Sequence, residues 1–235
     1  MTVPTMTFAG KNLLTDFDTF TDFSKAFGNP EHDYEFLDVL GLDGSLTIDN
    51  KRFKDRDIEI PAFVMNDFID KYRALMAFMN SRRGFQRVEC SHEPDHYRMA
   101  LFLGVVDPEP TQFLKDGRFV LPFRFHPQRW LKTGETATEV QTGDTMINPT
   151  LFESYPLIRM YGTGTLTINS QTITVSAHSY TYIDLDCRTM NAQYGSNRAN
   201  SYITTPDDYI TMKPGTNGIT TTLTKVEITP RWWEV

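Results

Sequence analysis

The stretch TGTLTINSQTITVS (residues 163–176) carries the clearest fold signal in the chain. Apolar residues alternate with polar ones at Leu166, Ile168, Ile173 and Val175, and the Asn-Ser pair between the two halves favours a turn. Successive side chains of a strand point to opposite faces of a sheet, so this alternation gives each half one apolar face. The stretch therefore predicts a β-hairpin.

The rest of the C-terminal region repeats this pattern of short strands. Segments 180–185, 209–212 and 226–228 have the alternation of strands, and PGTNG at 214–218 predicts a turn because proline and glycine supply the required backbone angles. No stretch in this region has helical periodicity. Short, regularly spaced strands without a helix predict a β-sandwich.

The N-terminal region contains one persuasive helix signal. Asn66 is a suitable N-cap, Asp67 and Asp70 lie in the positive first turn, and the helix should end before Arg82. Apolar residues recur at helical spacing: Phe68, Ile69, Tyr72, Leu75, Met76 and Met79. This periodicity predicts an amphipathic helix that packs on a core.

Strand patterns surround the predicted helix at 58–60, 85–90, 97–106 and 119–125. Pro122 interrupts the last of them, and because proline donates no ladder hydrogen bond it favours an edge position or a bulge. The chain as a whole is therefore predicted to be mainly β with one principal helix. We expect a β-rich α+β N-terminal domain followed by a C-terminal β-sandwich.

Threonine content marks a boundary between the two domains. Residues 1–130 contain 8 threonines, whereas residues 131–235 contain 22. The stretch LKTGETATEVQTGDTMINP that begins at Leu131 is polar and lacks aromatic residues, as expected of an exposed connection. We therefore expect an N-terminal domain at 1–130, a linker at 131–147 and a C-terminal domain at 148–235.

Composition disfavours several classes of function. With 23 basic and 30 acidic side chains among 235 residues, the formal charge is −7, which disfavours a surface for nucleic acids or anionic membranes. The first residues lack a signal-peptide pattern and no apolar run is long enough to cross a bilayer, so we expect synthesis in the cytoplasm and no membrane partner. The cysteines, Cys90 and Cys187, are far apart and give no support to a disulfide framework.

The sequence HEPDH at 92–96 matches the pattern in which two histidines on one helical turn bind zinc and a glutamate activates water. Pro94 lies inside the motif, where it would break the helix that this spacing requires, and strand patterns flank it. A hairpin turn is the favoured interpretation. An adventitious metal site that includes Cys90, and a metallopeptidase, are the alternatives.

Other candidate motifs also have structural interpretations. Trp232 and Trp233 could stack on a sugar, but alternation in a terminal strand favours packing in a core or an interface. The basic residues at 51–56 alternate with acidic ones, which favours contact with protein over phosphate binding. The sequence contains no Walker loop or dinucleotide fingerprint, and it points to no catalytic residue, no cofactor and no metal site.

Several motifs occur in a particular order along the chain. The N-terminal half carries FAGKNL, LGLDG, RFKDRDIEIP and a PDHY turn, and the C-terminal half carries SYPLIRMYGTGTLTINSQTITV, MKPGTNGI and the ending LTKVEITPRWWEV. From about Phe8 to Val235, this order resembles the distal tail protein family of siphophages, the bacteriophages with long non-contractile tails.

The resemblance implies a structural virion protein, a homohexameric ring that joins the tail tube to the baseplate or tail tip. In this family the N-terminal domain forms the ring and DNA passes through its lumen. The C-terminal domain is a galectin-like β-sandwich that serves host attachment as a docking platform. The resemblance therefore implies tail tube, tail-tip and receptor-binding proteins as partners, assembly in the host bacterial cytoplasm, and no enzymatic activity.

The LGLDG stretch and the charged segment after it are the expected inter-subunit contacts. The residues that we assign to these contacts are Gly41, Asp43, Gly44, Lys51, Arg52 and Arg56. LGLDG departs from the family pattern, in which a proline and an arginine are common in this loop.

A carbohydrate-binding β-sandwich module is the alternative function. Galectins hold galactosides with a histidine, an Asn-Pro-Arg stretch and a Trp-Glu pair. The nearest fragment here is Asn148-Pro149-Thr150, which breaks that pattern. The hub protein is therefore the preferred prediction.

Overall fold

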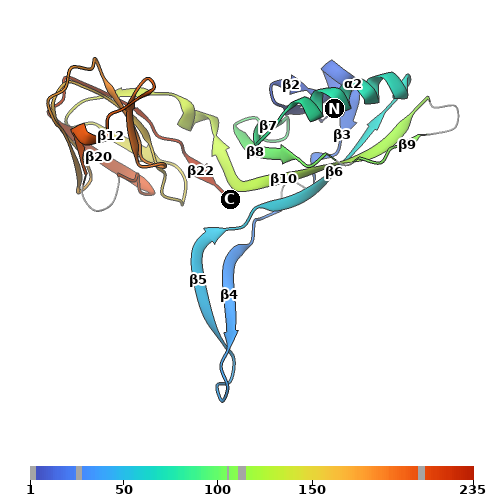
Figure 1. The fold of residues 1–235 in the computed structure, drawn as a ribbon, viewed down its shortest axis with the longest axis horizontal. Coiled ribbons are helices and arrows are strands. Elements are labelled where there is room, and N and C mark those ends of the chain that lie inside the picture. The colour runs from blue at the N-terminus through green and yellow to red at the C-terminus, as the bar shows by residue number, and fades with distance from the viewer. Residues whose placement is uncertain (1–3, 25–27, 105, 111–114, 206–209) are drawn as a thin grey trace. The chain divides into compact units, whose positions relative to one another are not determined.

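Figure 1 shows the structure, a computed structural model that describes residues 4–24, 28–104, 106–110, 115–205 and 210–235. The chain forms two compact units, residues 1–129 with Val235, and residues 130–234, which we call the first and second units. Each unit encloses a hydrophobic core of its own. Within the described residues, no helix has the length and apolar character needed to span a membrane.

The first unit combines short strands, one long hairpin and two helices. In chain order its elements are β1 (Met6–Phe8), β2 (Lys11–Asn12), α1 (Leu13–Phe17), β3 (Thr19–Thr21), β4 (His32–Asp38), β5 (Ser45–Phe53), β6 (Arg56–Val64), α2 (Phe68–Ser81), β7 (Gln86–Cys90), β8 (His96–Phe102), β9 (Glu109–Pro110) and β10 (Gly117–Leu131). Seven of the strands form a sheet in the order β2-β1-β7-β8-β10-β6-β3, and β9 pairs with the start of β10.

The core of the first unit lies between one face of this sheet and helix α2. Phe119, Leu121 and Phe123 alternate with outward-facing residues along β10 and are buried. Phe68 and Leu75 are buried on the side of α2 that packs on them. The predicted helix and the alternating strand at 119–125 are therefore confirmed.

The start of α2 differs from the prediction. We expected Asn66 to cap the helix, but the residue in the N-cap position is Asp67, and its side chain makes no capping hydrogen bond. Asn66 and Asp67 both have left-handed backbone angles, with φ of 59° and 51°, which turn the chain from β6 into the helix. Asp116 instead accepts a 2.8 Å hydrogen bond from the Asn66 N–H.

Pro122 does not lie at a sheet edge. Strand β10 pairs with β6 from Gly117 to Phe125, and β8 lies on its other side. The carbonyl of Pro122 accepts a 3.0 Å hydrogen bond from the N–H of Leu103, the residue after β8. A residue's N–H and C=O point to the same neighbour in an antiparallel sheet, so the missing donor falls where β8 has just ended.

The second unit is a β-sandwich, as predicted. Its elements are a 3₁₀ turn η3 (Lys132–Glu135), β11 (Thr138–Val140), β12 (Thr145–Asn148), β13 (Leu157–Tyr161), β14 (Gly164–Ile168), β15 (Gln171–Val175), β16 (Ile183–Asp186), β17 (Asn191–Tyr194), β18 (Asn197–Arg198), a 3₁₀ turn η4 (Asn200–Tyr202), β19 (Ile203–Thr204), β20 (Gly215–Thr221), β21 (Lys225–Thr229) and β22 (Trp233–Glu234). The sheet orders are β11-β21-β13-β16-β17-β18 and β12-β20-β14-β15-β19. Ile158 from one sheet and Leu166 from the other contribute to the shared core.

The segment expected to be a linker is mostly part of this sandwich. β11 pairs with β21, β12 pairs with β20, and Val140 is 4 % exposed in the core. The segment is polar because most of its residues face solvent on edge strands. The prediction that residues 131–147 form an exposed linker is therefore wrong. Independent folding of the two units stays a prediction.

The prediction of a turn at 214–218 is also wrong. Gly215 to Gly218 belong to β20, which pairs with β12 through Asn148 and Thr145. Asn217 is fully buried, and its amide donates to the carbonyls of Met146, Lys213 and Gly215. These side-chain hydrogen bonds hold an extended backbone in a sequence typical of turns.

Candidate protein-interaction surface

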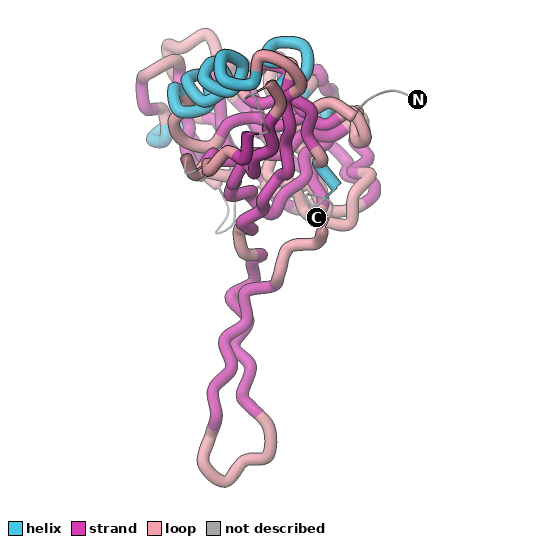
Figure 2. The backbone as a smooth tube through the Cα atoms, turned by 90° about the vertical axis from the view of Figure 1, so that its right-hand side faces the viewer, coloured by secondary structure: helices cyan, strands magenta, loops and turns pink. Residues whose placement is uncertain are grey.

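The β4–β5 hairpin is the largest exposed feature of the first unit. The strands pair from His32 with Phe53 to Asp38 with Ser45, with a bulge near His32. Every residue from 34 to 52 is solvent exposed in this chain. Figure 2 shows the pair as a narrow ribbon that is free of other elements for most of its length. An isolated two-stranded ribbon is at best marginally stable in water.

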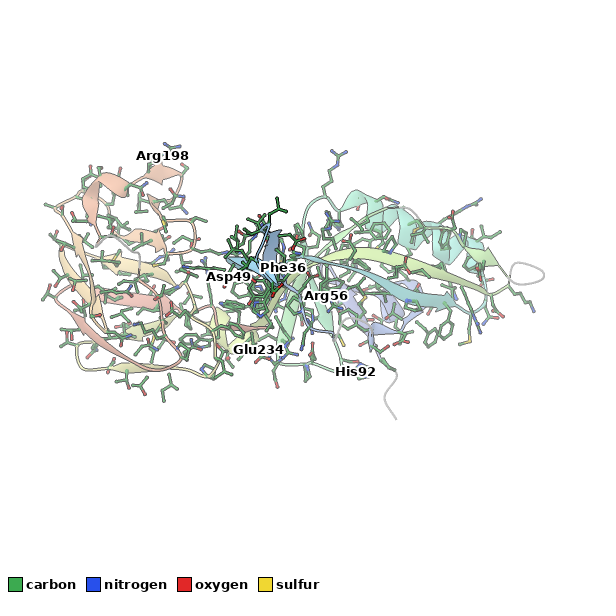
Figure 3. All side chains as sticks on the ribbon, turned by 90° about the horizontal axis from the view of Figure 1, so that it is seen from below. Phe36, Asp49, Arg56, His92, Arg198 and Glu234 are labelled. Carbon is green, nitrogen blue, oxygen red and sulfur yellow. The ribbon has the colours of Figure 1, made fainter. Side chains whose placement is uncertain are left out.

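Both faces of the hairpin carry apolar side chains. The register places Tyr34 and Phe36 on one face, and it places Leu37, Leu46 and Ile48 on the other. Their exposed fractions range from 38 % for Tyr34 to 66 % for Phe36. Figure 3 labels Phe36 on the hairpin. Contiguous exposed apolar surface of this kind marks an interaction site.

The tip of the hairpin, residues 39–44, is also apolar. Leu40 and Leu42 are 104 % and 56 % exposed. Gly41 and Gly44 have φ of 83° and 86°, a left-handed conformation that glycine adopts without steric cost. The Leu42 N–H donates to the Val39 carbonyl over 3.1 Å. The two glycines therefore shape a turn that presents leucines to solvent.

Ion pairs hold the base of the hairpin together. Arg52 Nε lies 2.6 Å from Asp33 Oδ2, and Lys54 Nζ lies 3.1 Å from Glu31 Oε1. The Arg52 guanidinium lowers the pKa of the Asp33 carboxyl by hydrogen bonding, against the opposing effect of burial. Asp33 is 7 % exposed, so its charge stays ionised and paired where the ribbon leaves the sheet.

The predicted contact residues fall into two groups along this hairpin. Gly41, Asp43 and Gly44 lie in the tip, and Lys51 and Arg52 lie near the base on β5. Arg56 begins β6, and its guanidinium donates to the carbonyl of Gly28. Sequence reasoning selected the charges and glycines but missed the apolar residues. The signal for them was the run VLGLDGSLTI, in which apolar residues flank a glycine turn.

The HEPDH stretch is a turn between strands and not a helix. It connects β7 to β8, and the His96 N–H donates to the Glu93 carbonyl over 3.1 Å. Glu93 bridges two arginines, with 2.9 Å to Arg98 Nη2 and 2.7 Å to Arg129 Nη1. Figure 3 labels His92 in this turn. The hairpin-turn interpretation is confirmed, and Glu93 has a structural role in an ion-pair network.

The described residues contain no group of three or more His, Cys, Asp or Glu side chains placed to hold a metal ion. Both cysteines are buried thiols. Burial raises the pKa of Cys90, and burial with the nearby Asp186 charge raises the pKa of Cys187 to about 12. Neither thiol has the lowered pKa that a nucleophile or metal ligand requires.

The terminal tryptophans are both engaged within the second unit. Trp232 is 5 % exposed in its core. Trp233 stacks on Phe152 with ring centroids 4.7 Å apart, and its Nε1 donates to the Glu153 carbonyl over 2.9 Å. The prediction that at least one tryptophan packs in the sandwich is confirmed.

The chain combines a helix-covered sheet that carries a long exposed hairpin with a two-sheet sandwich, and this fold is similar to that of a solved phage tail protein. That structure is the Dit protein (gp 19.1) of phage SPP1, described as a paradigm of the hub adsorption apparatus in phages that infect Gram-positive bacteria. The match has a TM-score of 0.74 and 16 % identity, and it covers 100 % of each chain. A chain of the phage P2 baseplate, in its activated conformation with Ca, matches with a TM-score of 0.50 and 10 % identity over 97 % of each chain. No protein-family model and no curated protein matches the sequence.

Proposed function

We propose that this chain is a structural hub protein of a siphophage tail, assembled as a homohexameric ring at the distal end of the tail. The first unit forms the ring, and the second unit faces tip or receptor-binding proteins as a docking platform. The partners are further copies of the chain, the tail tube protein and the tail-tip proteins. The protein is then a virion component that assembles in the host cytoplasm, and DNA only transits its lumen.

The observation that carries this proposal is the fold likeness to SPP1 Dit over the full length of both chains. A fold alone does not define a function, so the proposal also requires a surface suited to assembly. The β4–β5 hairpin supplies one, because its apolar faces and its apolar tip are exposed in a single chain. Burial of this surface between copies is the simplest way to stabilise it.

The electrostatics of the chain suit a conduit. Each chain has a formal charge of −7, so every copy added to an assembly increases its total repulsion of the nucleic acid backbone. An acidic ring would let DNA pass without binding it, since DNA-binding proteins neutralise phosphates with basic side chains. The role is structural, and the proposal assigns no residue to catalysis.

Light scattering and negative-stain images of the purified protein test the proposal. We expect closed rings of six-fold symmetry, because a head-to-tail interface must close to avoid filaments. A strict monomer at tens of micromolar that also fails to assemble on tail tube protein would contradict the proposal.

The carbohydrate-binding alternative gains no support from the tryptophan pair, because Trp232 is buried and Trp233 is stacked on Phe152. Glycan arrays should therefore give no reproducible signal with the full chain. A signal that disappears with Trp233→Ala would favour the alternative.

A further inference from the structure

The outward face of the main sheet in the first unit contains an open apolar hollow. Helix α2 covers the opposite face of this sheet (Figure 1). Phe63 on β6 and Val120 on β10 line the hollow and are 42 % and 40 % exposed. Phe20 on β3 stacks on Phe63 with ring centroids 4.7 Å apart. The volume is about 700 Å³, which is within the range of ligand-binding sites, so the hollow is a candidate binding site.

The strand register places the side chains of the hollow in rows. At this end of the sheet the strands lie in the order β3, β6, β10 and β9. Pro61 lies directly opposite Val120, and Phe63 lies opposite both Phe20 and Arg118. The apolar side chains of β3, β6 and β10 therefore form a continuous floor.

Carboxylates flank this floor on two sides. Asp22 follows β3, and its N–H donates to the Pro61 carbonyl over 2.9 Å. On the other side, Glu109 on β9 lies opposite Arg118, and Asp107 lies just before β9. The side chains that line the hollow include three carboxylates and one guanidinium, which gives a formal charge of −2. Charge complementarity therefore favours a basic occupant over an acidic one.

The backbone that carries these carboxylates is held by hydrogen bonds. The Ser24 N–H donates to Asp22 Oδ1 over 3.0 Å. The Tyr72 hydroxyl of α2 donates over 3.1 Å to the carbonyl of Val106, the residue before Asp107. Groups that are already positioned lose little conformational freedom when a ligand binds. Both acidic sides of the hollow are therefore in place before binding.

We propose that the hollow binds an extended segment of a partner protein in which an apolar side chain lies between two basic ones. Three strand spacings of about 4.8 Å separate β3 from β9, so the two acidic sides are about 14 Å apart, which an extended chain covers in about four residues. Side chains two residues apart on such a chain point to the same side. A basic-x-apolar-x-basic segment therefore places its apolar group on the floor and a basic group at each acidic side.

Matched peptides test the inference with the full chain. The probe is a fluorescein-labelled peptide that contains Lys-Ser-Leu-Ser-Lys, and fluorescence polarisation measures its dissociation constant. It should bind at least about tenfold more tightly than two peptides with the same label, one with glutamate in place of both lysines and one with serine in place of leucine. Equal binding of the three peptides would overturn the inference.

A substitution on the floor shows where the peptide binds. Val120→Asp places a charge among the apolar side chains and should weaken binding of the lysine peptide at least about tenfold. The control is Ile147→Asp, which changes a more exposed apolar residue of the second unit and should leave binding unchanged. Equal binding by the wild type and Val120→Asp would place the peptide elsewhere and contradict the inference.

Substitutions on the acidic side keep the test valid if Val120→Asp fails to fold. Asp107→Asn with Glu109→Gln should remove most of the preference for the lysine peptide over the glutamate peptide, because the acidic side at β9 is lost. Asp43→Asn with Glu153→Gln removes two exposed carboxylates outside the hollow and should keep that preference. The same preference in both double variants would overturn the inference.

The oligomeric state separates this inference from the proposed function, since the hollow lies within a single chain. The peptide should bind assembled and unassembled chains alike, because a partner segment requires the hollow to be open in the ring. Binding that is lost on assembly would mean that another copy covers the hollow, which would overturn the inference and support the proposed function. Peptide binding by a chain that never assembles would support the inference and contradict the proposed function.

Discussion

Gly117 shows how closely packed the start of β10 is. A Cβ at this position would lie 2.4 Å from Cε2 of Phe68, the first residue of α2. Gly117→Ala should therefore destabilise the first unit by about 1–3 kcal/mol, because the ring of Phe68 has to move out of the core. Chemical denaturation measures this change in the free energy of unfolding.

Gly218 is the matched control for Gly117. It also lies in a strand, its φ is not positive, and a Cβ there meets no atom within 4 Å. Gly218→Ala should change the free energy of unfolding by less than about 0.5 kcal/mol. Equal effects of the two substitutions would show that packing against Phe68 does not constrain Gly117.

Glu93 would activate water in a zinc protease, but in this structure it forms ion pairs with two arginines. Its side chain is 16 % exposed and bonded to Arg98 and Arg129. Glu93→Ala would remove the carboxylate that both guanidinium groups share, so we expect a loss of about 3 kcal/mol in the free energy of unfolding. Glu89→Ala, which removes a more exposed pair with Arg87, should cost less than about 1 kcal/mol.

The same Glu93 variant tests the protease alternative. The wild type should contain no stoichiometric zinc and should not hydrolyse casein. Zinc that is lost with His96→Ala, together with peptidase activity that is lost with Glu93→Ala, would contradict the structural role.

Asp186 makes the second unit sensitive to acid. Burial raises the pKa of its carboxyl, but hydrogen bonds from Arg231 at 2.8 and 3.2 Å outweigh this effect, and the pKa lies below its usual value. A lowered carboxyl pKa contributes stability above the unfolded pKa of about 4, and that stability is lost as pH falls through the folded pKa. The melting temperature should fall between about pH 5 and pH 3, and it should fall less in Asp186→Asn.

At the scale of single elements, the β4–β5 hairpin is the part of the fold that depends most on assembly. Its residues from 34 to 52 are exposed, so most of its stability in a single chain comes from contacts within the hairpin itself, which include its own ladder, side-chain hydrogen bonds, ring contacts and the ion pairs at its base. Hydrogen exchange of its amides should be fast in a monomeric preparation and much slower in rings. The β6 amides, which pair with both β10 and β3, should be protected in both states. Equal exchange of the hairpin in monomers and rings would contradict its role as a contact surface.

At the scale of the whole molecule, the boundary between the units decides which fragments fold. A fragment of residues 148–235 would lack β11 and nearly all of β12, which pair with β21 and β20, and it would lack Val140 from the core. A fragment that starts at Trp130 keeps these strands, as well as the 2.9 Å hydrogen bond from the Leu131 N–H to the Trp232 carbonyl.

We therefore expect residues 130–235 to show a β-type circular dichroism spectrum and a cooperative melt, and residues 148–235 to melt at a clearly lower temperature or not to fold. Equal melting temperatures would mean that β11 and β12 contribute little to the sandwich. If residues 130–235 do not fold when expressed as a separate fragment, folding of the second unit depends on the first unit.

Local periodicity was enough to predict several elements of the fold from the sequence. Alternation at Leu166 and Ile168 predicted β14, helical spacing from Phe68 predicted α2, and Pro94 favoured a hairpin turn over a zinc-binding helix. In each case the neighbours along the chain are enough to fix the backbone, because side-chain direction repeats with the secondary structure. Two β-rich units with one principal helix followed from these local signals.

Which residues are buried and which are exposed depends on contacts between distant segments, and these contacts could not be predicted from local patterns. The polar composition of the segment that contains β11 and β12 is typical of a linker, but β11 and β12 pair with β21 and β20 in the sandwich. Pro122 is accommodated inside the other sheet because β8 ends beside it. In the sequence, the apolar residues of the hairpin resemble ordinary core residues. In the structure Leu40 is fully exposed, because no other described element of the unit packs on it. Burial depends on which distant segments meet, and a contact between distant segments leaves no period in the sequence of either one.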